Sequence, residues 1–141
     1  MGEGELREIA TRLHASAIRL LRTLRREDDG SGLSAPRLSA LSVIAFAGPL
    51  SLAELAAAEQ VRAPTMSRIV EALVQGGLVT RETDGTDRRS VRIAATAEGR
   101  RLMEVGRERR VRALVGRLAG LADSERRALA RGVEIFERLT R

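Results

Sequence analysis

The chain has 141 residues, 43% of them hydrophobic and 31% charged, a balance typical of one folded domain and too apolar for a disordered chain. All 25 basic residues are arginine, set against 19 acidic residues, so the net charge is +6. The absence of cysteine excludes disulfides, thiolate metal sites and thiol redox chemistry, and the presence of only two aromatic residues disfavours base-stacking modules for single-stranded nucleic acid.

The first predicted element is an amphipathic helix at the N-terminus. Apolar residues recur at steps of three and four from Leu6 to Leu24, the period of a helix with one apolar face. We expect this helix to end in the acidic, glycine-containing loop REDDGSG, residues 26–32. Ser34 is then the expected N-cap of a second helix that runs to Ala47, with Pro36 in its first turn.

Two short helices are predicted next, joined by a tight turn. Ser51 followed by Glu54 is a capping-box pattern that opens the third helix. Residues 59–62 form the turn before the fourth helix, which has Pro64 near its first position and ends at the glycine pair 76–77. The spacing of its apolar residues predicts a core face made of Met66, Ile69, Val70 and Leu73.

The hydrophobic period then changes from that of a helix to that of a strand. Residues 78–82 (LVTRE) and 90–95 (SVRIAA) alternate apolar and polar side chains around the loop TDGTDRR, which predicts an antiparallel hairpin. Helical periodicity returns from about Ala97 to Ala119, and Asp123 is the expected N-cap of a last helix that carries Leu129, Val133, Phe136 and Leu139.

This order predicts a mainly α (α+β) fold, a winged helix-turn-helix. Two short helices joined by a tight turn form a helix-turn-helix, whose second helix can lie in the major groove of DNA. A hairpin after that second helix is a wing, and a narrow ribbon with arginines at its tip suits the minor groove.

The basic composition has two interpretations. The planar guanidinium group matches phosphates and the guanine edge, so the arginines favour duplex DNA as a partner. A chain rich in Arg, Ala and Gly without Lys also arises from a GC-rich genome, so composition alone leaves both open. The charged N-terminal residues lack the apolar core of a signal peptide, and the longest uncharged stretch, residues 38–53, is broken by Gly48-Pro49. We therefore expect a cytoplasmic protein.

Residues 51–102, SLAELAAAEQVRAPTMSRIVEALVQGGLVTRETDGTDRRSVRIAATAEGRRL, resemble the helix-turn-helix, wing and following helix of MarR-type (multiple antibiotic resistance regulator) transcriptional regulators. The most specific parts are APTMSRIVEALVQGGLV and DRRSVRIAATAEGRRL. The resemblance extends to nearly the whole chain. It implies a single MarR-like domain over residues 1–141, with a winged helix-turn-helix at about 34–97 and dimerisation helices at about 5–27 and 98–141.

The resemblance also implies how such a chain meets DNA. Family members are homodimers whose terminal helices interlock, so each dimer presents two winged helix-turn-helix units. We expect a palindromic operator that is read by recognition helices roughly 34 Å apart.

In the fourth helix the predicted core face leaves Thr65, Ser67 and Arg68 outside, near the end that enters the groove. Arg68 is the candidate for a bidentate guanine contact. The alternative, that Thr65 and Ser67 merely start the helix, stays open. The candidate phosphate contacts, for which solvated surface is the alternative, are Ser34, Arg37, Ser51 and Arg62.

In the wing, Arg89 is predicted to enter the minor groove, and Arg88 and Arg92 to reach phosphates. The family's Asp-x-Arg pattern implies that Asp87 holds Arg89 in a salt bridge. An exposed pair of this kind contributes only about 0 to 1 kcal/mol to stability, but it orders the arginine before DNA binds. We expect Asp87→Ala to weaken DNA binding in a titration, although it makes the wing more positive; tighter binding would show that charge alone decides.

Many MarR-like proteins bind a small amphipathic or phenolic molecule between the dimerisation region and the winged domain. His14, Arg19 and Arg22 are the candidates for such a pocket. His14 is the only histidine, and the sequence holds no Ser/His/Asp, HExxH or phosphate-loop pattern, so we expect no enzyme, no metal and no cofactor.

The expected function is a sequence-specific regulator of transcription that binds duplex DNA, a dimeric repressor on a palindromic operator. The alternative is a winged-helix protein-interaction module without DNA binding.

Overall fold

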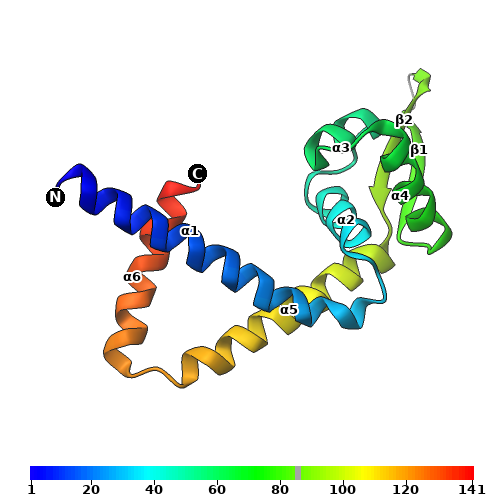
Figure 1. Ribbon diagram of the computed structural model, residues 1–141. Coiled ribbons are helices and arrows are strands. Elements are labelled where there is room, and N and C mark those ends of the chain that lie inside the picture. The colour runs from blue at the N-terminus through cyan, green and yellow to red at the C-terminus, as the bar shows by residue number, and fades with distance from the viewer. Residues whose placement is uncertain (85–86) are drawn as a thin grey trace.

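The elements follow the predicted order along the chain (Figure 1). The computed structural model describes residues 1–84 and 87–141, with the backbone alone for residues 84 and 87–89. It contains α1 (Glu3–Arg25), the 3-10 helix η1 (Arg26–Ser31), α2 (Ala35–Ala47), α3 (Leu52–Glu59), α4 (Ala63–Gln75), β1 (Val79–Asp84), β2 (Asp87–Ala95), α5 (Ala97–Ala119) and α6 (Asp123–Leu139). The mainly helical winged helix-turn-helix class is thereby confirmed.

Two local details differ from the sequence prediction. The expected loop at residues 26–32 contains a 3-10 helix that ends at Ser31 and is capped by Gly32, where φ is +74° and glycine carries no steric penalty. The N-cap of α6 is Ala122, with Asp123 as the first helical residue. The predicted cap was wrong by one residue: the Ala122 amide donates to the Glu125 carboxylate at 2.9 Å, a one-way contact that satisfies this amide without a capping side chain at Ala122.

The hydrophobic core lies in the lobe formed by α2, α3, α4 and the hairpin. The core face predicted for α4 is confirmed, because Met66, Val70 and Leu73 are buried and Ile69 is partly buried against them. Side chains from the neighbouring elements complete this core: Leu41, Ile44, Leu55, Val79 and Ile93. The second helix of the helix-turn-helix, α4, is therefore anchored along one face.

The wing is an antiparallel hairpin whose base belongs to this lobe. Val79 lies opposite Ala95, and Arg81 lies opposite Ile93. Leu50 forms an isolated antiparallel β-bridge with Ile93. The Leu50 amide donates to the Ile93 carbonyl at 3.1 Å, and the Ile93 amide donates to the Leu50 carbonyl at 2.8 Å. The base of the wing is thus hydrogen-bonded to the segment that precedes α3.

A compact junction joins the wing to α5. The Thr96 hydroxyl oxygen accepts the Gly99 amide at 3.1 Å and the hydroxyl donates to the Gly77 carbonyl at 2.7 Å. Gly99 lies so close to the Leu78 carbonyl that a Cβ atom has no room there. These contacts set the direction in which α5 leaves the lobe.

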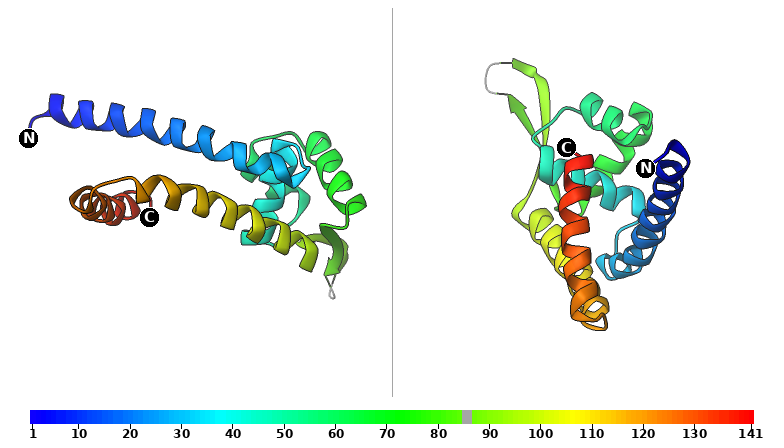
Figure 2. Two further views of the ribbon diagram at one scale, coloured as in Figure 1. Left: turned by 90° about the horizontal axis from the view of Figure 1, so that it is seen from below. Right: turned by 90° about the vertical axis from the view of Figure 1, so that its left-hand side faces the viewer.

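Beyond the junction, α1, α5 and α6 form an extended arm that projects from the lobe (Figures 1 and 2). Within the described chain, neither α1 nor α6 contains a buried residue. Large apolar side chains lie in the open along the arm, among them Leu21 (59% exposed), Val115 (56%) and Leu139 (70%). The apolar stripes of the arm are left uncovered by the chain's own lobe.

Within residues 1–84 and 87–141, no helix is both long and apolar enough to cross a membrane.

Candidate functional site

The exposed face of α4 carries the predicted base-reading residues. Arg62 is the N-cap of this helix and Pro64 lies in its first turn, so the helix begins where the turn after α3 ends. Thr65, Ser67 and Arg68 are all exposed. The three predicted groove-facing residues are thus exposed near the start of a helix anchored by its buried face, with Thr65 and Ser67, two positions apart, pointing to different sides of it.

The predicted phosphate contacts fall into two places. Ser51 is the N-cap of α3, and its hydroxyl oxygen accepts the Glu54 amide at 3.1 Å, which confirms the capping box. Arg62 is exposed in the turn before α4. Ser34 and Arg37 are exposed at the start of α2, and their neighbours line a hollow on the arm side of the lobe. These two residues therefore lie nearer the arm than the α4 face does.

Arg92, predicted to reach a phosphate, is paired within the chain. Its Nη1 atom lies 3.5 Å from Oε2 of Glu54, the same carboxylate that accepts the Ser51 amide at 3.3 Å. The second strand of the wing is thus tied to the start of α3. The side chains of Asp87, Arg88 and Arg89 lie outside the described residues, so their roles stay predictions from the sequence.

A second ion pair, which has no signal in the sequence, joins the first strand of the wing to α4. Nη2 of Arg81 donates to Oε2 of Glu71 at 2.8 Å, and Nε2 of Gln75 donates to Oε1 of the same carboxylate at 3.0 Å. The hydrogen bond from Gln75, followed by that from Arg81 and the charge of Arg81, lowers the pKa of Glu71 below its ordinary value of 4.5.

The direction of this shift gives only the sign of a small effect on stability, because the pair is exposed. A carboxyl group with a lowered pKa in the folded state stabilises the fold above its unfolded-state pKa and loses that contribution as pH falls through the folded-state value. Glu71 therefore stays ionised, and paired with Arg81, throughout the neutral range.

The charge of the lobe is almost balanced. Residues 34–96 contain seven arginines against six acidic residues, which leaves a net charge of +1. The two ion pairs neutralise two of these arginines. In the described part of the chain Arg37, Arg62 and Arg68 form no ion pair and remain exposed. The positive field of the lobe is therefore concentrated at a few guanidinium groups rather than spread over its surface.

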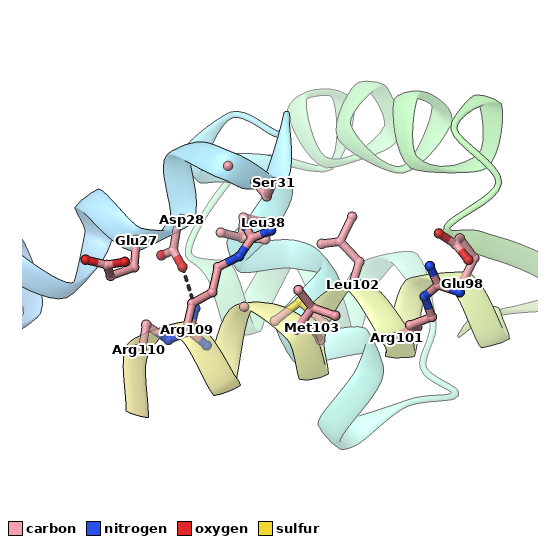
Figure 3. Close-up of a pocket in the computed structure, with 13 residues that line it drawn as sticks. Glu27, Asp28, Ser31, Leu38, Glu98, Arg101, Leu102, Met103, Arg109 and Arg110 are labelled. Carbon is pink, nitrogen blue, oxygen red and sulfur yellow. Dashed lines mark hydrogen bonds and ion pairs between the residues drawn. The ribbon is translucent and has the colours of Figure 1, made fainter. Parts of the chain in front are cut away.

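Two hollows lie where the lobe meets the arm. The smaller, of about 180 Å³, is bounded by η1, α2 and α5. Figure 3 shows Arg109 and Arg110 of α5 reaching toward η1, where Arg110 forms an ion pair with Asp28. The larger, of about 570 Å³, lies between the end of α1, η1 and α2, and has both apolar and charged walls that include Leu21, Leu24, Arg25 and Arg110.

The predicted ligand residues lie apart from the walls of these hollows. His14, Arg19 and Arg22 are exposed on α1, and the described residues that line the two hollows do not include them. The Asp28–Arg110 pair borders both hollows and had no signal in the sequence, because 82 positions separate its two members.

Comparison with known proteins places these features in context. A family model described as the MarR family matches residues 31–90. An HTH-type transcriptional regulator of Mycobacterium tuberculosis is 34% identical over 128 residues, which cover 91% of this chain and 90% of that protein. The fold is similar to that of a MarR family protein from Bacillus stearothermophilus, with a TM-score of 0.80, 25% identity and coverage of 100% of this chain and 99% of that one.

A more distant structure adds a relative solved together with a nucleic acid. A mutant of MepR from S. aureus, bound to an oligodeoxyribonucleotide, has a TM-score of 0.71 at 15% identity, with 94% of this chain and 98% of that chain covered. At that identity the likeness concerns the fold alone.

Proposed function

This chain belongs to the MarR family of transcriptional regulators, and from that membership we propose that it is a dimeric repressor that binds a palindromic operator in duplex DNA. MarR family regulators are transcription factors rather than enzymes. In the proposed division of the domain, residues 34–97 read the DNA, and residues 5–27 and 98–141 form the dimer. The proposal places the protein in the cytoplasm, where the operator is accessible.

The observation that carries the DNA-binding proposal is the exposed face of α4. Thr65, Ser67 and Arg68 are exposed on a helix whose core face is buried, and Arg68 pairs with no carboxylate in the described chain. A guanidinium held ready on a rigid helix suits the two acceptors on the major-groove edge of guanine. Arg62 and Ser51, at the starts of α4 and α3, are the proposed phosphate contacts beside it.

The exposed apolar surface of the arm supports the proposal of a dimer. Exposed apolar side chains recur along α1, α5 and α6, and a stripe of this length on a monomer would be costly to leave in water. A second copy of the same arm presents the same stripe and can cover it with twofold symmetry. Two lobes related by that symmetry would then read a palindrome.

The salt dependence of binding tests the proposed contacts. With four phosphate contacts per subunit, and eight per dimer, the slope of log K against log salt should be about −7. The measurement is a fluorescence-anisotropy titration of the operator duplex over a range of salt concentrations. A slope near zero would argue against binding through the phosphate backbone.

We also propose that a small amphipathic or phenolic molecule relieves repression. The larger hollow has about the size of small-molecule sites and combines apolar walls with the guanidinium groups of Arg25 and Arg110. It lies between the arm and the lobe, where a ligand would change their relative orientation. His14, Arg19 and Arg22 lie on the same helix as its α1 wall and remain candidates. Adding phenolic carboxylates to the operator titration should release the DNA; unchanged affinity with such compounds would oppose this part of the proposal.

The alternative function, a protein-interaction module without DNA binding, gives a different result for two arginines. Replacing Arg68 and Arg89 together by alanine removes the proposed major-groove and minor-groove contacts. An operator affinity that is unaffected by this double substitution would favour the alternative.

A further inference from the structure

The wing leaves the lobe between two ion pairs, one on each strand. Arg81 on β1 pairs with Glu71 of α4 at 2.8 Å, and Arg92 on β2 pairs with Glu54 of α3 at 3.5 Å. The strand positions are adjacent, because Arg81 lies opposite Ile93 and Arg92 lies opposite Glu82. The hairpin is thus tethered at one level to both helices of the helix-turn-helix.

This level is where the hydrophobic anchoring of the hairpin ends. Val79, Ile93, Ala94 and Ala95 are buried at its base. Further along the first strand, Thr80 to Thr83 are exposed. From here outward the core no longer fixes the direction of the hairpin, so the side-chain tethers, together with the backbone hydrogen bonds between Leu50 and Ile93 at the same level, restrain its angle to α4.

Neither pair is suited to stabilising the fold. The side chains of Arg81 and Glu71 are 41% and 51% exposed, and those of Arg92 and Glu54 are 40% and 57% exposed. Exposed pairs contribute little to folding because water screens the charges and the side chains lose entropy. A carboxylate on the recognition helix also repels DNA phosphates. The charge of Glu71 is therefore unfavourable for DNA binding. The hydrogen bonds that Gln75 and Arg81 donate to its carboxylate indicate that its role is to hold these groups in place.

We propose that Glu71, through its ion pair with Arg81, positions the wing relative to the recognition helix, with the Glu54–Arg92 pair as the counterpart on the second strand. The inference rests on the proposed DNA-binding function and deepens it. The three residues from Arg81 to Asp84 span about 10 Å, so a tilt of about 10° at the tether displaces the far end by about 2 Å. That displacement exceeds the tolerance of a hydrogen bond. A wing held at a fixed angle reaches the minor groove when α4 enters the major groove. Less conformational entropy is then lost on binding than with a wing that is free to tilt.

The decisive variant is Glu71→Gln, because two accounts predict opposite signs for it. If only charge matters, removing a carboxylate from the DNA-facing lobe tightens binding. If Glu71 positions the wing, the same change weakens operator binding by roughly three- to tenfold, the scale of one additional side chain ordered on binding. The measurement is a fluorescence-anisotropy titration of the full-length protein on the palindromic duplex from its own upstream intergenic DNA.

Two further variants separate positioning from charge and from folding. Glu108→Gln is the matched control, because it makes the same charge change in the exposed Glu108–Arg112 pair of α5, which joins atoms 3.6 Å apart; we expect it to leave operator affinity within about twofold. The reciprocal exchange Glu71→Arg with Arg81→Glu keeps the net charge and restores a pair, so it should recover most of the affinity lost in Glu71→Gln. All variants should melt within a few degrees of the parent protein.

The outcomes distinguish this inference from the function on which it rests. If the unmodified protein shows no preference for any palindrome over random duplex, the proposed function fails and this inference fails with it. If the protein prefers the palindrome but Glu71→Gln binds equally well or more tightly, the positioning role alone is overturned. Weakened binding by Glu71→Gln, with recovery in the exchanged pair, supports it.

Discussion

Arg68→Ala is expected to weaken operator binding by at least about thirtyfold. A bidentate arginine–guanine contact contributes about 1 to 3 kcal/mol of discrimination at each half-site, and a dimer has two half-sites. Arg68 is exposed on the helix face that α4 turns away from the core, and no carboxylate of the described chain competes for its guanidinium. The loss should appear on the operator and scarcely on random duplex, and the preference at one base pair of each half-site should relax.

The control for Arg68 removes the same charge elsewhere. Arg131 lies on the exposed polar side of α6, so Arg131→Ala should leave operator affinity nearly unchanged. Anisotropy titrations of both variants on operator and random duplexes give the comparison. An equal loss on both duplexes would mean that Arg68 contacts only phosphate, and no loss on either would exclude it from the interface.

Removing apolar side chains from the arm, and so disrupting the proposed dimer, should reduce operator affinity more than any other change. Val133 and Phe136 of α6 are 48% and 42% exposed, and they lie on the apolar stripe that we assign to the dimer. Replacing both by glutamine removes that apolar surface without adding charge. Linking two binding units raises overall affinity by about 10²- to 10⁴-fold over one unit, so a monomer should lose a factor of this order on a palindrome.

The matched control replaces two polar residues of the same helix. Glu134→Gln with Arg138→Gln leaves the net charge unchanged and alters the opposite side of α6. Sedimentation velocity should report a dimer for the parent and for this control, and a monomer for the Val133 and Phe136 variant. A variant that is monomeric yet binds the palindrome as tightly as the parent would contradict the proposal that a twofold dimer binds the palindrome.

The elements of this fold could be read from the sequence because local patterns specify them. The spacing of Met66, Ile69, Val70 and Leu73 gave the buried face of α4, and Ser51 with Glu54 gave the start of α3. The one cap that was wrong, Asp123 in place of Ala122, involves neighbouring residues that both precede the same carboxylate at position 125. Such errors of one residue are intrinsic to cap prediction.

The tethers of the wing could not be predicted in this way. Glu71 and Arg81 are ten positions apart and come together only because the chain turns at Gly76-Gly77, where Gly77 has a φ of +71°. Arg92 reads from sequence as a free cation of the wing, and only the folded arrangement brings Glu54 to it. No sequence rule predicts which residue of a separate helix a strand residue will contact.

The apolar stripes of the terminal helices illustrate a different limit. A stripe such as that of α6 has the same period whether the chain's own core or a second copy covers it. Sequence periodicity therefore predicts the helix but not its partner. The structure adds that the described chain buries no residue of α1 or α6 in its own core.

The distribution of arginine also changes the meaning of the composition. Residues 97–141 hold twelve arginines against seven acidic residues, a net charge of +5, whereas residues 34–96 hold a net charge of only +1. Most of the excess positive charge thus lies outside the proposed DNA-reading lobe. The total charge is consistent with a compositional bias of the genome, and the specific evidence for DNA is the placement of Arg68 and Arg62.

The most direct test of the account is the preference of the unmodified protein for twofold DNA. Labelled duplexes from the upstream intergenic region, one with its palindrome intact and one with the same bases scrambled, are titrated by fluorescence anisotropy at two salt concentrations. We expect the palindrome to bind tighter by about 10³-fold or more at physiological salt. Equal affinity for the palindromic and scrambled duplexes at both salt concentrations would contradict it.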